Sequence, residues 1–501
     1  MKNLSLVSAA FAATLALTAC GGSDSDSPAP TPSPAPTPAP TPAPAPGPAP
    51  AGDRIEPLDT ATLRRSAPVK VQPAAVSRLP ASASVPRVAL GALAKTKQVA
   101  SATKGAALQI GLGRDVKATA GAAELGQRLQ WQRLPDGAQV AAVAFSSDGA
   151  QAIRLGVRVL ELPQGAVLRF YGSDASKVSE MTAAELAAMR QTNDAAGVPA
   201  DAARMAWGPA TNGDVATLEV QIPAGAAAGE VRLAVPQLSH LMQTPEQTLA
   251  TKNTRQIGNS GSCNLDSMCA PALSVESRAV AKMMFNAGAS TYMCTGTLLN
   301  DTRNSQTPYM LSAAHCISDQ AAASTLVTYW FFRAAECNSS PRFDQQASVM
   351  EGGATLLFAN ERLDTTLLQL NRQPPANVVY AGSYFGADAV PDVGVVGIHN
   401  PAGDLQKYSV GAIRGYANCE GEGNCSNSDV NAGYMLRVNW QQGTTEGGSS
   451  GSAIFAQSGN TRYVVGALHG GAASCQNPNG SDFYGRFQRS FAAGIGGWLT
   501  K

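Results

Sequence analysis

The chain has 501 residues, of which 44% are hydrophobic and 15% are charged, and 37 basic side chains balance 36 acidic ones. A net charge of +1 excludes a nucleic-acid partner held by bulk electrostatics, because domains of that kind are usually strongly basic. It also gives no sign of a polybasic membrane surface or an acidic tail. The length is enough for two or three domains of roughly 150 residues each.

The N-terminus has the pattern of an export signal. Lys2 supplies a positive start, and Leu4–Leu17 is an apolar run that is too short to span a bilayer as a helix. The run continues into Thr18-Ala19-Cys20, which resembles the lipobox of bacterial lipoproteins. The resemblance implies that residues 1–19 are a signal peptide, that a lipid on Cys20 anchors the protein to a membrane, and that Gly21 favours sorting to the outer membrane. We therefore expect an exported lipoprotein of the outer membrane or cell surface.

Residues 20–52 are expected to form a tether. Every even position from Pro28 to Pro50 is proline, which accounts for 12 of the 32 prolines. Each ring fixes φ and removes a backbone donor, so neither helix nor sheet can form. A polyproline spacer of this length reaches about 70 Å at roughly 3.1 Å per residue. A ligand for a proline-recognition domain is the alternative.

Residues 53–257 are expected to form a β-rich domain, because short apolar runs alternate with turns such as Pro-Asp-Gly and Asn-Gly-Asp. The spacing favours a small sandwich or jelly roll. Thr182 and Glu185 predict a capping box before a helix over Leu186–Arg190. Residues 53–125 are weakly patterned and allow no structural prediction. The predicted strands are Gln139–Phe145, Ala152–Val159, Ala166–Tyr171, Val215–Ile222 and Val231–Val235.

This domain carries no recognisable chemistry. It has no cysteine, and its one histidine, His240, stands beside Leu241 and Met242. A lone histidine in such a setting is expected to be packed or exposed rather than catalytic. The function of the domain therefore has to be inferred from its position in the chain rather than from its residues.

All eight cysteines after Cys20 lie between Cys263 and Cys475. An even number in an exported segment fits four disulfides, although the sequence alone leaves 105 pairings open. No Cys-x-x-Cys or His-Glu-x-x-His spacing occurs, and the histidines are scattered. We therefore expect no metal site and no cofactor.

Two residues of the second half have the contexts of a general base and its carboxylate partner. His315 follows the apolar run Tyr309–Leu311 and precedes Cys316, so a strand end and a disulfide can hold it rigidly. Asp364 stands at the start of the buried run Thr365–Leu370. An aspartate there can orient an imidazole and stabilise its cation.

The sequence Glu446-Gly447-Gly448-Ser449-Ser450-Gly451 predicts a tight turn around a nucleophile. The glycines allow backbone N–H groups to point at a developing oxyanion. We expect Ser450 to be the nucleophile, with the N–H groups of Gly448 and Ser450 forming the oxyanion hole.

The segment from Gly258 to Lys501 is similar to the trypsin-fold serine endopeptidases, and most closely to the bacterial lysyl endopeptidases. The resemblance implies an all-β domain over residues 258–501 with two six-stranded antiparallel barrels and the site between them. It implies the disulfides Cys263–Cys475, Cys269–Cys337 and Cys294–Cys316. Cys419 and Cys425 remain, and their spacing suits a local bridge that is extra to the family pattern. The matching motifs are Gly261–Asn264, Cys294–Leu298, His315-Cys316, Asp364–Leu368, Gly448–Ser452, Leu468–Gly471 and Asp482–Arg486.

The resemblance also implies a preference for basic residues. The acid of trypsin-like pockets lies six residues before the nucleophile, where this chain has Thr444. Lysyl endopeptidases place an aspartate further on, and Asp482 matches it. A buried carboxylate selects a cation, because a charge without its partner is costly to bury. We expect cleavage after Lys, with Arg as a further option. His469, Gly470 and Gly471 are expected to line the substrate site, and a histidine there leaves a glutamyl specificity as an alternative.

Activation is expected to differ from that of pancreatic enzymes. There a freed N-terminal ammonium pairs with an aspartate before the nucleophile, but here that residue is Ser449. Removal of a pro-region would then unblock the site rather than build it. The mature start of the family aligns with Gly258, whereas a basic-specific enzyme would cut itself after Lys252 or Arg255.

The sequence thus predicts a membrane-tethered precursor in which residues 53–257 are a pro-region and residues 258–501 a serine endopeptidase acting on proteins or peptides, the mature enzyme being released outside the cell. A permanent carbohydrate- or surface-binding module is the alternative for the first domain. A catalytically inactive, protease-like surface binding protein is the alternative for the whole chain.

Overall fold

The computed structural model describes residues 52–63, 75–93, 105–174, 177–245, 260–339, 348–387, 391–421 and 424–501. All of them belong to one structural unit, Ala43–Lys501. Residues 1–51, with the predicted signal peptide, Cys20 and nearly all of the tether, lie outside the described residues. None of the helices within these ranges combines the length and the apolar character that crossing a membrane requires.

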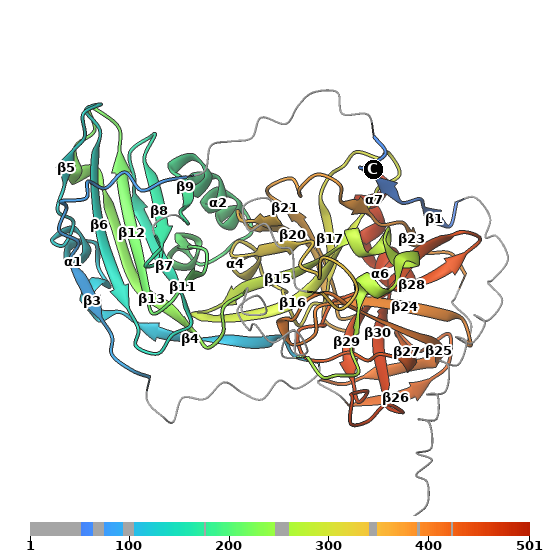
Figure 1. Cartoon of the computed structure of the whole chain (residues 1–501). Helices are drawn as coiled ribbons and strands as arrows, with labels where there is room; N and C mark the ends of the chain where they lie inside the picture. The colour runs from blue at the N-terminus through green and yellow to red at the C-terminus, as the bar shows by residue number, and fades with distance from the viewer. Residues whose placement is uncertain are drawn as a thin grey trace, which may run out of the picture. The chain divides into compact units, whose positions relative to one another are not determined.

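The N-terminal domain is a sandwich of two sheets, coloured blue to green in Figure 1. Its strands are β3 (Arg87–Ala89), β4 (Leu108–Asp115), β5 (Gln132–Arg133), β6 (Gln139–Ser146), β7 (Ala152–Glu161), β8 (Val167–Tyr171), β9 (Ser179–Thr182), β10 (Met205–Trp207), β11 (Thr211–Asn212), β12 (Val215–Ile222) and β13 (Arg232–Leu241). One sheet has the order β3-β6-β12-β8-β9, and the other includes β10-β7-β13-β4. Phe145 of β6 and Leu155 of β7 belong to one buried cluster, so apolar residues of both sheets form the core.

The predicted strands of this domain correspond to β6, β7, β8, β12 and β13, and β13 continues six residues further than predicted, to Leu241. The predicted helix is α2 (Ala183–Ala195), with both capping-box bonds present between Thr182 and Glu185. Helices α1 (Ala122–Gly126) and α3 (Ala200–Ala203) are short. His240 is buried, and its Nδ1 lies 2.7 Å from Ser147 Oγ, so this histidine is packed.

In the first part of the C-terminal domain, six strands follow the order β18-β15-β16-β17-β21-β20. The strands and helix of this part are β15 (Val280–Ala287), β16 (Ser290–Leu299), β17 (Tyr309–Ser312), β18 (Val327–Trp330), β19 (Val349–Met350), β20 (Ala354–Asn360), β21 (Thr365–Leu370) and α4 (Gln320–Ala323). Met283, Leu298, Trp330 and Leu368 are among the residues that fill its core. The pairs are antiparallel, as the family resemblance implies, but among the described residues no pairing between β18 and β20 closes this sheet into a barrel.

The next six long strands form a closed antiparallel barrel, because β24, β25, β27, β30, β29 and β28 pair in a ring. Their bounds are β24 (Gly394–His399), β25 (Lys407–Cys419), β27 (Met435–Gln442), β28 (Ala453–Ser458), β29 (Thr461–Gly471) and β30 (Ser481–Arg486). The period of two is visible in β27, where Leu436, Val438 and Trp440 belong to the barrel core. Smaller elements are β14 (Leu265–Asp266), β22 (Val379–Tyr380), β23 (Ser383–Tyr384), β26 (Cys425–Ser428), α6 (Phe487–Ser490) and α7 (Gly496–Leu499).

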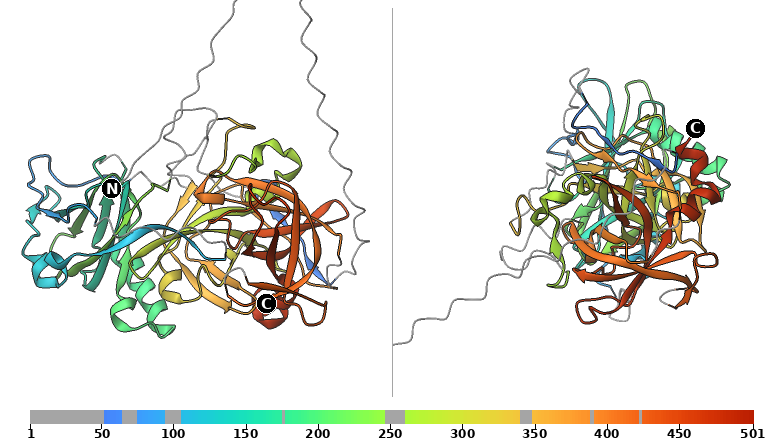
Figure 2. Two further views of the ribbon diagram at one scale, coloured as in Figure 1. Left: turned by 90° about the horizontal axis from the view of Figure 1, so that it is seen from below. Right: turned by 90° about the vertical axis from the view of Figure 1, so that its right-hand side faces the viewer.

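A continuous ladder joins the two domains. β4 pairs antiparallel with β13 of the sandwich on one side and with β16 of the protease domain on the other. The light-blue ribbon of β4 can be followed from one domain to the other in Figure 2. The protease sheet and the sandwich sheet are therefore one twelve-stranded sheet.

A short segment after the tether packs on the protease domain. β1 (Arg54–Ile55) pairs with β23, and β2 (Leu58–Asp59) pairs with β22 (Figure 1). Arg278 adds an ion pair to Asp59 at 2.5 Å.

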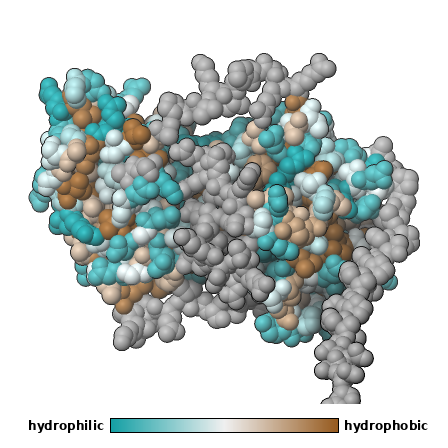
Figure 3. Space-filling view, viewed as in Figure 1, coloured by the Kyte–Doolittle hydropathy of each residue, from teal (hydrophilic) through white to brown (hydrophobic). Residues whose placement is uncertain are grey.

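On the face shown in Figure 3, apolar and polar residues are interspersed rather than gathered in one apolar patch.

Candidate active site

His315 follows β17, the strand that the apolar run predicts. The adjacent Cys316 is bonded to Cys294 of β16, and the Cys316 N–H donates to the Ala313 carbonyl at 3.1 Å. A strand end, a tight turn and a disulfide thus fix the backbone of His315. This is the rigid mounting that a general base needs.

Asp364 lies directly before β21 and faces His315. Its Oδ1 accepts the His315 backbone N–H at 2.9 Å, and its Oδ2 lies 2.7 Å from His315 Nδ1. The backbone of Asp364 has a φ of 43°, a conformation that non-glycine residues adopt at a cost and that is enriched at functional sites. Burial alone raises the pKa of this carboxyl, but attraction to His315 and hydrogen bonds from His315 and His469 outweigh it and lower the pKa below the usual range.

His469 of β29 is a second partner of the same carboxylate. Its Nδ1 lies 2.6 Å from Asp364 Oδ2, and its Nε2 lies 3.3 Å from the carbonyl oxygen of Gly421. The His315 and His469 rings are edge to face, with centroids 5.9 Å apart. Sequence reasoning places His469 near the substrate, and the structure additionally makes it part of the cluster around Asp364.

Ser450 lies in the tight turn before β28. Gly448 has a φ of 93° and Gly451 a φ of 79°, so both positions favour glycine. A side chain at Gly451 would also meet Ala313 N and Thr295 O at 2.7 Å. Within the described residues, no acceptor takes the N–H of Gly448 or Ser450, so both remain available for an oxyanion.

The nucleophile candidate and the base candidate do not touch each other through a hydrogen bond. Ser450 Oγ makes a long hydrogen bond, 3.4 Å, to the carbonyl oxygen of Ala106 in the N-terminal domain. His315 Nε2 is buried and has no hydrogen-bond partner among the residues described. Catalytic hydrogen bonds are often loose in a site without substrate, and they tighten in the reacting complex.

Asp482 is fully buried on β30. Its Oδ2 accepts two hydrogen bonds of 2.7 Å, from Trp440 Nε1 and from Thr445 Oγ1. Both of these donors are neutral side chains. Neither Trp440 nor Thr445 is among the residues that the sequence predicts, because they are remote from Asp482 along the chain and carry no motif of their own.

Gly470 and Gly471 connect His469 to this carboxylate. Gly471 pairs with Asp482 across the β29–β30 ladder. A Cβ on Gly471 would lie 2.6 Å from Asp482 Cα and 2.7 Å from Asp482 Oδ1. The glycine therefore leaves the space that the carboxylate occupies.

A further histidine that sequence reasoning missed lies behind the nucleophile turn. His399 at the end of β24 is fully buried, with Nδ1 2.8 Å from Ser449 Oγ and Nε2 3.1 Å from Ser409 Oγ. Ser409 Oγ donates in turn to the Thr444 carbonyl at 2.7 Å. Ser449, the residue before Ser450, is thus held by a buried polar chain instead of an aspartate–ammonium pair. The only sign of this in the sequence is that Ser449 replaces the aspartate.

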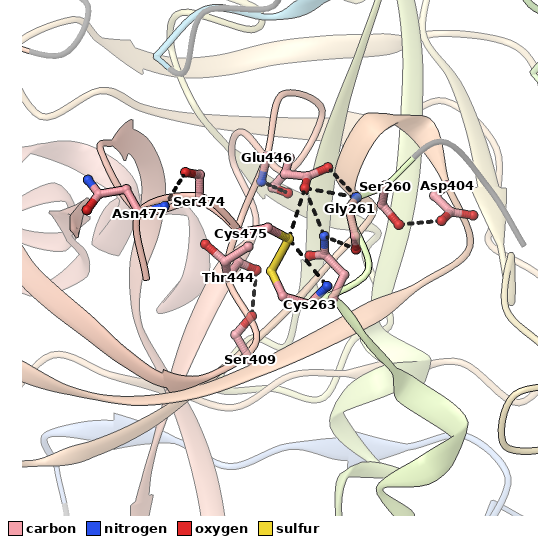
Figure 4. The surroundings of a disulfide bond; sticks show 12 residues. Ser260, Gly261, Cys263, Asp404, Ser409, Thr444, Glu446, Ser474, Cys475 and Asn477 are labelled. Atoms are coloured by element: carbon pink, nitrogen blue, oxygen red, sulfur yellow. Dashed lines mark hydrogen bonds between the residues drawn. A yellow bond between two sulfur atoms is a disulfide. The ribbon is translucent and has the colours of Figure 1, made fainter. Parts of the chain in front are cut away.

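Four disulfides brace the C-terminal domain, and one of them adjoins the nucleophile turn. Figure 4 shows Cys263–Cys475 beside Glu446, whose carboxylate accepts the Gly261 N–H at 3.0 Å. Glu446 also accepts from Asn264 Nδ2 at 3.0 Å. The start of the C-terminal domain is therefore tied to the turn that carries Ser450. The pairs are Cys263–Cys475, Cys269–Cys337, Cys294–Cys316 and Cys419–Cys425, as the family resemblance and the remaining cysteine spacing imply.

One group in the described ranges brings three ligand atoms close together without a disulfide, namely His315, Asp364 and His469, within 4.8 Å of one another. Both rings direct Nδ1 at the same carboxylate oxygen. The other two groups contain cysteines that are already in disulfides and offer no thiolate. The arrangement suits proton transfer between hydrogen-bonded partners better than ion binding.

Comparisons with known proteins agree with this architecture. A family model described as the lysyl endopeptidase C-terminal domain matches residues 257–485, and one described as the lysyl endopeptidase N-terminal domain matches residues 81–242. A lysyl endopeptidase from Pseudomonas aeruginosa is 34% identical over 418 residues, which cover 77% of this chain and 82% of that protein. The protein is a trypsin-like serine endopeptidase. It belongs to the lysyl endopeptidase family.

Two solved structures give more distant likenesses. The MamO protease domain from Magnetospirillum magneticum is 11% identical with a TM-score of 0.31, covering 44% of this chain and 97% of that one. A serine endoprotease from Yersinia pestis is 16% identical with a TM-score of 0.30, covering 44% of this chain and 63% of that one.

Proposed function

We propose that the enzyme hydrolyses peptide bonds after Lys, and also after Arg, with Ser450 as nucleophile, His315 as general base and Asp364 as the carboxylate that orients His315. The observation that carries the proposal is the pair of contacts from Asp364 to the His315 backbone N–H and Nδ1. They fix the ring with Nε2 unpartnered among the described residues, and Nε2 is the atom that must take a proton.

In the proposed reaction, Ser450 Oγ attacks the carbonyl carbon of the substrate while His315 Nε2 accepts the hydroxyl proton. The oxyanion binds the N–H groups of Gly448 and Ser450. His315 then gives the proton to the leaving nitrogen, which releases an amine and leaves an acyl-enzyme. Water, activated by His315 in the same way, hydrolyses the ester and restores Ser450. Asp364 stays ionised throughout, consistent with its lowered pKa.

Lysine preference is assigned to Asp482. Its complete burial supports a carboxylate that gains from a substrate ammonium. The name of the Pseudomonas relative, a lysyl endopeptidase, supports the same specificity.

The test is hydrolysis of a matched set of peptide anilides ending in Lys, Arg, Glu or norleucine. We expect activity on Lys and Arg, with Ser450→Ala lowering it by several orders of magnitude. Ser458→Ala, at the end of β28 away from the turn, serves as the control. A fluorophosphonate probe should label the wild-type enzyme and not Ser450→Ala. Absence of labelling in a folded protein would instead support a binding protein with an inactive site, and preference for the Glu substrate would refute Asp482 as the selecting acid.

We also propose that residues 53–257 are a pro-region removed at maturation and that Cys20 carries a lipid anchor on an exported precursor. The ladder between β4 and β16 supports the first part, since it places the N-terminal domain against the protease sheet. Mass spectrometry of the active species should find an N-terminus near Lys252, Arg255 or Gly258. Retention of residues 53–250 would favour a permanent binding module.

Replacing Cys20 by Ser should abolish incorporation of labelled palmitate.

A further inference from the structure

A segment of the N-terminal domain lies directly in front of the nucleophile candidate. The carbonyl oxygen of Ala106 is 3.4 Å from Ser450 Oγ, and Gly105 before it is buried. Ala107 packs against the buried cluster of the protease domain that includes Met283 and Trp330. The group that contacts the Ser450 hydroxyl in this structure therefore belongs to the N-terminal domain of the same chain.

The strand that continues from Ala106 has a defined direction and register. β4 runs antiparallel to β16, with Leu108 opposite Met293 and Gln109 opposite Tyr292. Two residues beyond Met293, the Thr295 N–H donates to the Ser450 carbonyl at 2.8 Å, and Thr295 Oγ1 donates to the Gly448 carbonyl at 2.9 Å. β16 of the protease domain thus both pairs with β4 and supports the turn that carries Ser450.

This placement is that of a peptide substrate. Extended peptides bind by adding a strand to a sheet edge, which fixes their register through backbone hydrogen bonds. The Ala106 carbonyl oxygen accepts a hydrogen bond from Ser450 Oγ at 3.4 Å, so the 106–107 peptide bond lies beside the nucleophile. Resting on the proposed function, we propose that Gly105–Asp115 is a tethered substrate mimic in which Ala106 takes the position of the selected residue and Ala107–Asp115 take the leaving-group side.

Two features of the segment explain why it blocks rather than reacts. The side chain of Ala106 is a methyl group, which offers no cation to Asp482. Within the described residues, the N–H groups of Gly448 and Ser450 donate to no acceptor, so the Ala106 carbonyl is next to the hydroxyl but outside the oxyanion hole. The segment has the backbone of a substrate and lacks the side chain that would pull its carbonyl into the hole.

Glycines and buried contacts hold the segment in this register. A Cβ on Gly113 would lie 3.1 Å from the Ala289 carbonyl carbon, and one on Gly111 would lie 3.1 Å from Thr291 Cβ. Thr291 Oγ1 donates to Ser239 Oγ of β13 at 2.8 Å. Backbone atoms cannot move away cheaply, so a larger side chain at Gly113 would force β4 off the protease domain.

The first test supplies the missing cation. In the full-length precursor, Ala106→Lys should turn the mimic into a substrate: Ser450 attacks the carbonyl carbon of residue 106, the 106–107 bond breaks, and Ala107 leaves with a free amine. Intact mass and N-terminal sequencing should find a new chain starting at Ala107. The double variant Ala106→Lys with Ser450→Ala should stay uncut. Ala107→Lys, one residue out of register, is the matched control and should not be cut after residue 107.

The outcomes separate this proposal from the proposed function. A preparation that hydrolyses Lys anilides but does not cut Ala106→Lys at the 106–107 bond overturns the mimic and leaves the enzyme assignment intact. Cutting of Ala107→Lys at a similar rate, or of the wild type after Lys104, overturns the register. Failure to hydrolyse any Lys anilide overturns the proposed function itself.

A second test does not depend on cleavage. Gly113→Leu in the intact precursor should speed fluorophosphonate labelling of Ser450 by about tenfold or more, because β4 no longer covers the hydroxyl. Gly126→Ala, in α1 where a Cβ meets no atom within 4 Å, is the control and should label at the wild-type rate. Equal labelling of Gly113→Leu and wild type would show that β4 does not shield the nucleophile.

Discussion

Asp482→Asn offers the sharpest test of how one buried carboxylate sets specificity. Both donors, Trp440 Nε1 and Thr445 Oγ1, bind the same oxygen of Asp482. An asparagine can keep both bonds with its carbonyl oxygen and place its NH₂ where Oδ1 now lies. The change therefore removes the charge while preserving the side-chain shape and these two hydrogen bonds.

The size of the effect is set by burial. Removing one partner of a buried ion pair costs about 3–5 kcal/mol, which corresponds to a loss of roughly 10²-fold to several thousandfold in kcat/KM. We expect that loss on Lys and Arg anilides and little change on a norleucine anilide, which has no ammonium. Asp482→Leu is the contrast, because it leaves both donors unsatisfied at about 1–3 kcal/mol each and should lower Tm as well. Equal losses on lysine and norleucine substrates, with Tm unchanged, would refute the assignment of Asp482 as the selecting acid.

Three other predictions concern the support of the site and of the N-terminal domain. Gly471→Ala should raise KM for Lys substrates more than it lowers kcat, because its Cβ would displace the Asp482 carboxylate; an unchanged KM would contradict this. His399→Ala should lower kcat about tenfold or more with KM nearly constant and Tm reduced, since Ser449 loses its buried partner; wild-type kcat would exclude a positioning role. Burial lowers the pKa of His240, so the unfolded state binds its proton first and precursor stability should fall as pH drops below about 6.5. His240→Asn should flatten that slope in Tm between pH 7 and 5, and an unchanged slope would assign it to other groups.

Local patterns predict a large part of the fold. The alternation in β12 and the capping box at Thr182 are short-range signals, and both elements form where the sequence places them. The sequence does not predict β4, because glycine, which is depleted in strands, takes two of its eight positions. Those glycines make sense only from the partners on either side of the strand, Ser239 and Ala289, which no local pattern specifies.

The candidate site likewise combines residues that the sequence predicts with contacts that it does not predict. The contexts of His315, Asp364 and Ser450 are local, and the structure brings His315 and Asp364 into contact. Two other features depend on the strand register of the closed barrel. They are the contact of His469 with Asp364 and the burial of His399 behind the nucleophile turn. Register is set by pairing between strands far apart in the chain, so spacing alone could not reveal these contacts.

The disulfide with the shortest sequence separation, Cys419–Cys425, makes the site sensitive to reduction. Cys419–Cys425 closes a short loop that contains Gly421, and the Gly421 carbonyl holds the outer nitrogen of His469. Reduction would free that loop and release one end of a ring whose other end binds Asp364. No cysteine takes part in the proposed chemistry, yet turnover should depend on the reduction potential of the compartment. Molecules retained among cytosolic thiols would then be less active than those that reach an oxidising space.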